Sequence, residues 1–455
     1  MMTLPDPHVL IVGGGASGTL LAVNLLRQEG PRVTLVERRP GQLARGVAYS
    51  AADDSHLLNV RAANMSAFPD DCDHFVRWLG QAGLGDGRSF VRRTVYGAYL
   101  RSLLTDAKAV AGDRLTLIAD EVVALTEGNG GVTARFADGR EEGFDRAVLA
   151  LGNLPPHPPA GIDLAALPAG VYRDDPWAGD IADGLSADDA VLLLGSGLTA
   201  VDAALLLERR GFAGRITAMS RRGLRPRPHD DSQPPVAPRS EKPARSVSAL
   251  VREVRQAAAG DGWRGAVDAL RPVTQLLWSG ADGAERRRFL RHLRPFWDVH
   301  RHRLAPAVGA RIDAMVAAGR LRFAAGKLVE VTGAGDAALV RHRPRGRDTV
   351  ETARYARIVN CTGPQGDLSR SREPLLEQLT GAGLIRPDAC HLGIDVDAAT
   401  RTIGADGSAT PTLHAIGPMT RGMWWEVVAI PDIRVQCWTL ARSLANTHWV
   451  GGEGL

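Results

Sequence analysis

The sequence predicts an α/β fold with two domains, each built around a mainly parallel β-sheet. Short apolar runs at residues 8–12 and 190–194 each precede a glycine-rich turn and a helix-like stretch. Further apolar runs end in glycine, at Gly152, Gly363 and Gly417. Short apolar runs bounded by turns are typical of parallel strands that are buried on both faces.

The first apolar run begins a strand-turn-helix-strand unit, which fits within about 30 residues. We expect a strand over residues 8–12, a helix over 19–28 and a second strand over 32–36. The turn between the first strand and the helix reads Gly-Gly-Gly-Ala-Ser-Gly and satisfies the pattern GxGxxG. This combination predicts a Rossmann-like dinucleotide-binding domain.

Each glycine of this turn has a separate physical role in holding a pyrophosphate. Gly13 allows the sharp turn, Gly15 lets the backbone approach the phosphates, and Gly18 lets the helix pack against the strand. Ala16 and Ser17 belong to the same turn, and the helix N-terminus that follows offers unpaired N–H groups and the positive end of the helix dipole.

Glu37 follows the second predicted strand, nineteen residues after Gly18. A carboxylate at that place accepts hydrogen bonds from ribose hydroxyls and repels a 2′-phosphate. The first domain is therefore expected to bind FAD or NAD rather than NADP.

The second unit has a predicted strand at 190–194, a helix at 198–209 and a strand at 215–220. Its turn has the pattern GxGxxA, with Ala200 in place of the third glycine. No carboxylate stands at the position that matches Glu37, which falls near Met219. The expected cofactor contacts from this turn are Gly195, Ser196, Gly197 and Thr199.

Two arginines, Arg221 and Arg222, end the second strand of this unit. Arginine at this place can pair with a 2′-phosphate, which favours NADPH over NADH. The alternative is that both side chains stack on adenine or face solvent, and NADH then remains open.

We expect residues 1–160 to form the first part of an FAD-binding domain and residues 356–455 its second part. Residues 161–355 are expected to form an NAD(P)-binding domain with a helical insertion at about 223–318. Within the insertion, 223–245 is rich in Pro, Arg and Asp and suggests a loop or lid. Basic residues gather around 286–303, as a solvated helix face or an anion-binding surface.

Composition excludes several other classes of protein. The net charge of +4 is too small to indicate a nucleic-acid partner. No stretch of about 20 apolar residues predicts a membrane span, and no basic leader precedes the first apolar run. The four cysteines form no CxxC pair, and His300 and His302 would lie on different faces of a helix, so we expect no metal site. We expect a cytoplasmic protein, with homo-oligomer formation left open.

With these residues assembled, the chain resembles the bacterial FAD-NAD(P)-binding family. This family is related to flavin-containing monooxygenases and includes flavin-dependent urate hydroxylases. The likeness is carried by stretches that span nearly the whole chain, namely Gly46-Val-Ala-Tyr49, His56-Leu-Leu-Asn-Val60, Asn64-Met-Ser66, Phe75-Val-Arg-Trp78, Gly195-Ser-Gly-Leu-Thr-Ala-Val-Asp202, Trp297-Asp-Val-His-Arg-His-Arg303 and Trp425-Glu-Val-Val-Ala-Ile-Pro-Asp-Ile-Arg434.

The resemblance implies positions for FAD along the first domain. FAD would lie on the first turn, with the segment from Asn59 to Met65 along its flavin end. Gly152 would be the hinge that leaves the FAD domain, and Gly417 would approach the pyrophosphate or ribityl chain. The other implied contacts are Ala429 and Ile430 over the isoalloxazine ring, together with Arg38 and Val123.

The sequence departs from related flavoproteins in two places. Pro418 stands where an Asp often binds the ribityl hydroxyls, and the FxGxxxHxxxW signature of Baeyer–Villiger monooxygenases is missing. The ribityl contact and that subclass's mechanism are therefore not carried over.

A cofactor pair of FAD and NAD(P)H without a CxxC dithiol points to monooxygenation. The expected substrates are O2 and a small polar molecule, for example a heterocycle such as urate. The alternatives are N-hydroxylation of an amine or amino acid, an NAD(P)H oxidase or flavin reductase, and a binding protein with structural FAD. Candidate catalytic residues are Glu426, Trp425 and Asn59, although consecutive tryptophans also suit core packing.

Overall fold

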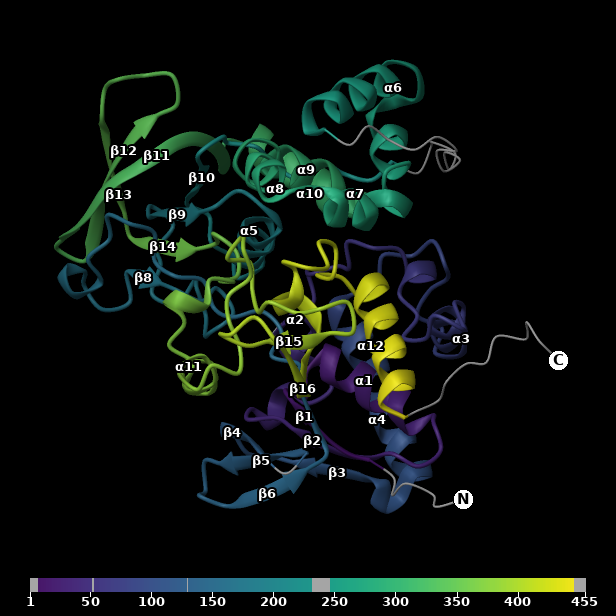
Figure 1. The fold of residues 1–455 in the computed structure, drawn as a ribbon. Helices are drawn as coiled ribbons and strands as arrows, with labels where there is room; N and C mark the ends of the chain where they lie inside the picture. Colours follow the sequence, from purple (N-terminus) through teal and green to yellow (C-terminus); the bar gives the residue numbers. More distant parts are fainter. Residues whose placement is uncertain (1–6, 51–52, 129, 231–245, 446–455) are drawn as a thin grey trace, which may run out of the picture. The chain divides into compact units, whose positions relative to one another are not determined.

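A computed structural model describes residues 7–50, 53–128, 130–230 and 246–445 of the chain. The chain divides into two compact units (Figure 1). Unit 1 contains Met1–Ala52, Val60–Leu154 and Gly366–Leu455, and unit 2 contains Asp53–Asn59 and Pro155–Gln365. The sequence-based boundaries kept residues 1–160 together, whereas the structure groups residues 53–59 with unit 2.

Unit 1 is built on a six-stranded sheet with the order β15-β16-β7-β1-β2-β3. All neighbouring pairs are parallel except β15 and β16. The strands are β1 (His8–Val12), β2 (Arg32–Val36), β3 (Leu115–Ile118), β7 (Arg146–Leu149), β15 (Arg401–Ile403) and β16 (Ala409–Ala415). The predicted strands at 8–12 and 32–36 are confirmed residue for residue.

The register of this sheet brings the ends of four strands to one edge. Val36 lies opposite Val12, Val12 opposite Leu149, and Leu149 opposite Ala415. The segments that follow these four strands therefore leave the sheet at the same edge.

Long helices cover the parallel sheet of unit 1. Helix α1 (Ala16–Leu26) packs against α4 (Arg93–Ala111) and α12 (Ile430–Leu444), as Figure 1 shows. The shorter helices are α2 (Gly46–Ser50), α3 (His74–Gln81) and α11 (Pro374–Gly381). A separate antiparallel sheet, β4 (Val122–Gly128), β5 (Gly131–Phe136) and β6 (Glu141–Phe144), shares a hydrophobic core with β1, β7 and α11.

Unit 2 contains a seven-stranded sheet with the order β13-β12-β11-β10-β9-β14-β8. Its parallel part is β8 (Tyr172–Arg173), β14 (Arg357–Asn360), β9 (Ala190–Leu194), β10 (Arg215–Ser220) and the start of β11 (Leu321–Ala334). Strands β12 (Ala337–Pro344) and β13 (Glu351–Tyr355) extend β11 as an antiparallel ribbon. The sheet of mainly parallel strands and helix α5 (Leu198–Arg209) confirm the predicted Rossmann-like class.

The chain between β10 and β11 is mainly helical, as Figure 1 shows in teal. It contains α6 (Val247–Asp268), α7 (Thr274–Gly280), α8 (Gly283–Arg288), a π-helix (Phe289–Leu293), α9 (Arg294–Arg301) and α10 (Pro306–Ala317). Helix α6 bends at Gly262, whose φ of 73° is not helical. Most of the loop predicted at 223–245 lies outside the described residues.

Short 3₁₀ helices complete the fold, at Pro40–Gln42, Ala62–Asn64, Gly112–Arg114, Leu164–Ala166, Arg271–Val273, Leu368–Arg370 and Gly417–Thr420. Among the described helices, none is long and apolar enough to cross a membrane.

The buried histidine His414, in β16, should make the stability of unit 1 depend on pH. Burial lowers the pKa of this histidine from 6.5 to about 4. The unfolded chain therefore binds a proton that the folded chain does not bind between pH 6.5 and pH 4. We expect His414 to remove about 3 kcal/mol of the free energy of unfolding as the pH falls through that window.

Denaturant unfolding at several pH values, compared between the native chain and His414→Gln, measures this contribution. The variant should show a shallower pH dependence than the native chain between pH 6.5 and pH 4. Parallel pH curves for the native chain and His414→Gln would contradict the assignment.

Candidate dinucleotide-binding sites

The first glycine turn leaves room for no side chain at two of its positions. Gly13 has a φ of +104°, and its N–H donates to the Val36 carbonyl at 2.9 Å. A Cβ added at Gly13 would lie 2.5 Å from the Ala150 carbonyl oxygen, and one at Gly18 would lie 1.9 Å from the Gly13 carbonyl oxygen. The turn therefore packs directly on the backbone that follows β7.

Helix α1 begins at this turn with its first N–H groups uncapped. Gly15 is the N-cap, no side chain caps it, and no acidic side chain stands in the first turn. The first backbone bond of the helix runs from the Thr19 N–H to the Gly15 carbonyl at 2.9 Å. The N–H groups of Ala16, Ser17 and Gly18 have no intrahelical acceptor, so the helix end can bind an anion such as a pyrophosphate.

Glu37 is held beside the turn at the end of β2. The side chain is buried, and its carboxylate accepts hydrogen bonds from the N–H groups of Gly14 and Arg39, each at 3.0 Å. Each carboxylate oxygen keeps a further lone pair, so the group can also accept from ribose hydroxyls.

The guanidinium of Arg38 is engaged within unit 1. It lies 3.0 Å from the Glu121 carboxylate and 2.7 Å from that of Glu373, which raise the pKa of Arg38. Val123 is a half-buried residue of β4. The expected FAD contacts of Arg38 and Val123 remain predictions. The Arg38 guanidinium is already paired with two carboxylates.

Gly417 meets the start of α1 after β16. It has a φ of +76°, and a Cβ added there would lie 2.7 Å from the Ser17 hydroxyl oxygen. Its N–H donates to the Gln436 side-chain oxygen at 2.7 Å. Gly152, which follows β7, also has a positive φ, of +67°. The carboxyl ends of β1, β7 and β16 thus each lead into a glycine-containing turn at the same edge of the sheet.

A second uncapped helix end belongs to unit 1. Helix α12 begins at Ile430 after the N-cap Ala429, which makes no side-chain cap. The N-terminal end of this helix carries the positive end of a helix dipole. This is the end to which the resemblance assigns contact with the isoalloxazine ring.

The candidate catalytic residues Trp425 and Glu426 are buried in the turn that leads into α12. The Trp425 ring lies 5.5 Å from the Arg421 guanidinium. The neighbouring Trp424 packs against the hydrophobic core of unit 1, as the packing alternative predicted for these tryptophans. The catalytic roles of Trp425 and Glu426 stay predictions.

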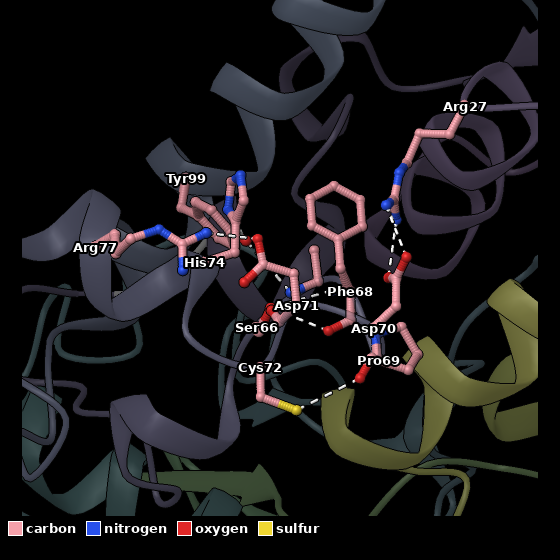
Figure 2. A network of polar contacts seen from close by, with 11 residues as sticks. Arg27, Ser66, Phe68, Pro69, Asp70, Asp71, Cys72, His74, Arg77 and Tyr99 are labelled. Carbon is pink, nitrogen blue, oxygen red and sulfur yellow. Dashed lines mark hydrogen bonds and ion pairs between the residues drawn. The ribbon is translucent and has the colours of Figure 1, made fainter.

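A polar network fixes the loop after Met65, and sequence reasoning did not find it (Figure 2). The Ser66 hydroxyl donates to the Asp71 carbonyl at 2.6 Å, and Tyr99 accepts from the Ala67 N–H at 3.3 Å. Arg27 pairs with Asp70 at 2.8 Å at the edge of the same loop.

Arg434 connects this loop to α12 through a bond to the Ser66 carbonyl at 2.9 Å. Both residues stand in stretches that carry the family resemblance, and that was the available signal. Met65 itself is buried in unit 1.

Asn59 is held in unit 2. Its carbonyl accepts a hydrogen bond from His229 at 3.0 Å. His56 is fully buried: its Nδ1 accepts from the Asp53 N–H at 3.1 Å, so its Nε2–H donates to the Asp202 carbonyl on α5 at 3.0 Å. This packing against α5 explains why residues 53–59 group with unit 2. The FAD contact and catalytic role of Asn59 stay predictions.

The second glycine turn repeats the geometry of the first. The Gly195 N–H donates to the Met219 carbonyl at 2.7 Å, and a Cβ added there would lie 2.2 Å from the Cys361 carbonyl oxygen. Gly197, the N-cap of α5, has φ −84° and ψ −163°, close to the −71° and −163° of Gly15. Helix α5 also lacks a side-chain cap.

The Ser196 side chain stabilises the loop after β10 rather than projecting from the turn. Its hydroxyl donates to the Leu224 carbonyl at 2.5 Å and lies 2.8 Å from the Ser220 hydroxyl. A cofactor contact from Ser196 would therefore come from its backbone. Gly197 and Thr199 remain predicted contacts, and no atom lies within 4 Å of a Cβ added at Gly197.

The two arginines after β10 have different surroundings. The Arg222 guanidinium lies 4.9 Å from the Phe296 ring and donates to the His292 carbonyl at 3.3 Å. Arg221 is exposed and makes no ion pair with the part of the chain that the structure describes. Arg221 is thus the free cation at the end of β10.

Neither a dithiol nor a metal cluster occurs among the described residues. Cys361 and Cys437 are buried, and burial raises the pKa of each thiol. Cys72 is exposed and Cys390 is half-buried.

Comparison with known proteins supports the reading of unit 1. Residues 10–154 match a family model described as FAD-NAD(P)-binding. This match confirms the family resemblance over that segment, and the description of the family names FAD and NAD(P). A search of curated protein sequences found no significant match.

Solved structures share the fold over nearly the whole chain. Ornithine N-hydroxylase from Kutzneria sp. 744, with reduced FAD, NADP⁺ and L-ornithine, has a TM-score of 0.66 at 17% identity and covers 97% of this chain and 100% of its own. L-lysine 6-monooxygenase from Pseudomonas syringae has a TM-score of 0.65 at 17% identity, with coverage of 97% and 100%. The cadaverine monooxygenase of Erwinia amylovora, bound to FAD, has a TM-score of 0.64 at 13% identity, with coverage of 98% and 95%. At these identities the likeness establishes the fold.

The first turn predicts that Gly15→Val lowers FAD occupancy. A Cβ at Gly15 would lie 3.2 Å from the Gly46 Cα, and the rest of the valine would occupy the space that a pyrophosphate needs. The ratio of flavin to protein absorbance after purification measures the loss.

Gly80→Val is the matched control, because a Cβ at Gly80, in α3, has no atom within 4 Å. Thermal unfolding of both variants without added cofactor separates lost binding from lost folding. Native flavin content in folded Gly15→Val would contradict FAD binding at this turn.

Proposed function

We propose that this protein is a flavin-dependent monooxygenase that uses NADPH and O2 to hydroxylate a small amine at nitrogen. The observation that carries the proposal is the presence of two glycine turns of the same geometry, each before an uncapped helix, in two separate units. One dinucleotide site would suffice for a structural cofactor, whereas two sites suit hydride transfer between two dinucleotides.

The comparisons favour an amine substrate over urate. The three enzymes with solved structures are named for ornithine, lysine and cadaverine, each of which carries a primary amine. None of them is named for a heterocycle. We therefore adopt N-hydroxylation, which the sequence left as an alternative, in place of the urate reading.

The reaction balances with one amine, O2, NADPH and a proton giving a hydroxylamine, NADP⁺ and water. FAD, when bound, supplies the two-electron chemistry that connects NADPH to O2. The residues of the first turn would hold its pyrophosphate through the N–H groups of α1, and Glu37 would accept from its ribose. The buried turn with Trp425 and Glu426 would exclude water from the reacting centre.

The second turn would hold NADPH in unit 2. The N–H groups at the start of α5 would bind its pyrophosphate. The exposed, unpaired guanidinium of Arg221 would bind the 2′-phosphate, whereas Arg222 is committed to Phe296 and His292.

Two further functions remain as competitors. An NADPH oxidase or flavin reductase would use the same two cofactors and would release peroxide or reduced flavin. Disulfide reduction is disfavoured, because the four cysteines are free in the described structure and none stands in a CxxC pair.

The monooxygenase proposal predicts that a substrate amine couples NADPH oxidation to hydroxylation. We expect ornithine, lysine or a diamine such as cadaverine to raise the rate of NADPH oxidation and to lower the peroxide yield, because a filled pocket excludes water. Oxygen uptake, peroxide and hydroxylamine are measured together, with urate as the comparison substrate. Full conversion of O2 to peroxide with every amine would favour the oxidase.

The Arg221 assignment predicts a selective loss of NADPH affinity. Loss of a charge-assisted bond costs about 1.5–3 kcal/mol, so Arg221→Gln should weaken NADPH binding roughly tenfold to a hundredfold and leave NADH binding unchanged. Arg222→Gln is the matched control, with a much smaller expected effect. Equal losses for NADPH and NADH, or a larger loss in Arg222→Gln, would reject this role for Arg221.

A further inference from the structure

A groove of about 420 Å³ lies along helix α4 in unit 1. This volume falls within the range of small-molecule sites. The polar residues that line the groove are Arg45, Thr94, Arg101, Ser102, Thr105 and Asp106. No residue of the first glycine turn lines the groove, and six of its seven lining residues belong to α4.

Two guanidinium groups face this groove without a carboxylate partner. Neither Arg45 nor Arg101 forms an ion pair with any described residue, although many other arginines of the chain do, such as Arg27 with Asp70. The Arg45 Nε is buried and has no hydrogen-bond partner there. Burial and the nearby charge of Arg101 lower the pKa of Arg45, so the two cations repel each other.

The fold keeps Arg45 in this position. Its Nη2 donates to the Gly41 carbonyl at 2.7 Å, and its side chain lies over Gly97 of α4. A Cβ at Gly97 would lie 2.7 Å from the Tyr49 carbonyl oxygen and 3.0 Å from the Arg45 Cδ, so a larger residue would displace both from the helix. The like-charged pair is therefore built into the groove, and an anion between the two groups would relieve their repulsion.

We propose that this groove binds a small phosphate monoester that carries hydroxyl groups, such as a sugar phosphate. A phosphate monoester has a charge of about −1.5 to −2 at neutral pH, which matches two guanidinium groups better than a single carboxylate does. Arginine also binds phosphate through two parallel hydrogen bonds.

The remaining lining residues suit the organic part of such a ligand. The Asp106 carboxylate can accept hydrogen bonds from hydroxyl groups, and Thr94 and Thr105 can donate or accept. The Ser102 hydroxyl donates to the Tyr99 carbonyl at 2.8 Å, so it can only accept from a ligand.

Calorimetric titration of the FAD-loaded protein with glucose 6-phosphate tests the proposal. Saturating NADP⁺ keeps the phosphate subsites of unit 2 filled, and low ionic strength limits screening at the exposed Arg101. We expect glucose 6-phosphate to bind and glucose not to bind. Arg101→Gln should weaken the affinity at least tenfold.

Arg88→Gln is the matched control, because Arg88 is an exposed arginine of unit 1 outside the groove. It removes the same charge and should leave the affinity unchanged, while flavin content should equal that of the native protein in both variants. Absence of binding, or equal binding by native protein and Arg101→Gln, would overturn the proposal. Inorganic phosphate binding as tightly as glucose 6-phosphate would overturn the role assigned to Asp106 and the threonines.

Discussion

Each unit depends on the direct contact of a side-chain-free turn with the backbone beside it. At Gly13 the partner is the Ala150 carbonyl, and at Gly195 it is the Cys361 carbonyl. A Cβ at either glycine would come within 2.5 Å of that oxygen, closer than real Cβ contacts allow. Each turn is therefore held against the neighbouring strand, and the helix after it starts at a fixed place with its N–H groups free.

Because these turns present backbone groups rather than side chains, they can recognise a cofactor but not distinguish one substrate from another. The glycine turns and uncapped helices offer backbone N–H groups, which recognise phosphates and carry no information about a substrate. Under the proposed function, substrate choice would come from side chains rather than from these backbone groups.

The elements predicted best from the sequence are the buried parallel strands. Strands β1, β2, β9 and β10 have the predicted bounds because both faces of each are covered and the apolar run equals the strand. Helix α1 was expected over 19–28 but spans Ala16–Leu26. The reason is that the last glycine of the motif, Gly18, already lies within the first helical turn.

What the sequence missed depends on contacts between distant residues. The bond from Arg434 to Ser66 joins residues 368 positions apart, and neither residue has a local pattern that indicates its partner. The grouping of residues 53–59 with unit 2 likewise depends on the burial of His56 against α5. Arg221 and Arg222 are equivalent in sequence, and the positions of Phe296 and His292 distinguish them.

The proposed function requires that one chain holds FAD and NADP⁺ at the same time, on separate glycine turns. Titration of purified, FAD-loaded protein with NADP⁺, followed by quantification of both bound dinucleotides, tests it directly. We expect one FAD and one NADP⁺ per chain, with FAD retained at saturating NADP⁺. Displacement of FAD by NADP⁺, or a total of one dinucleotide per chain, would contradict it.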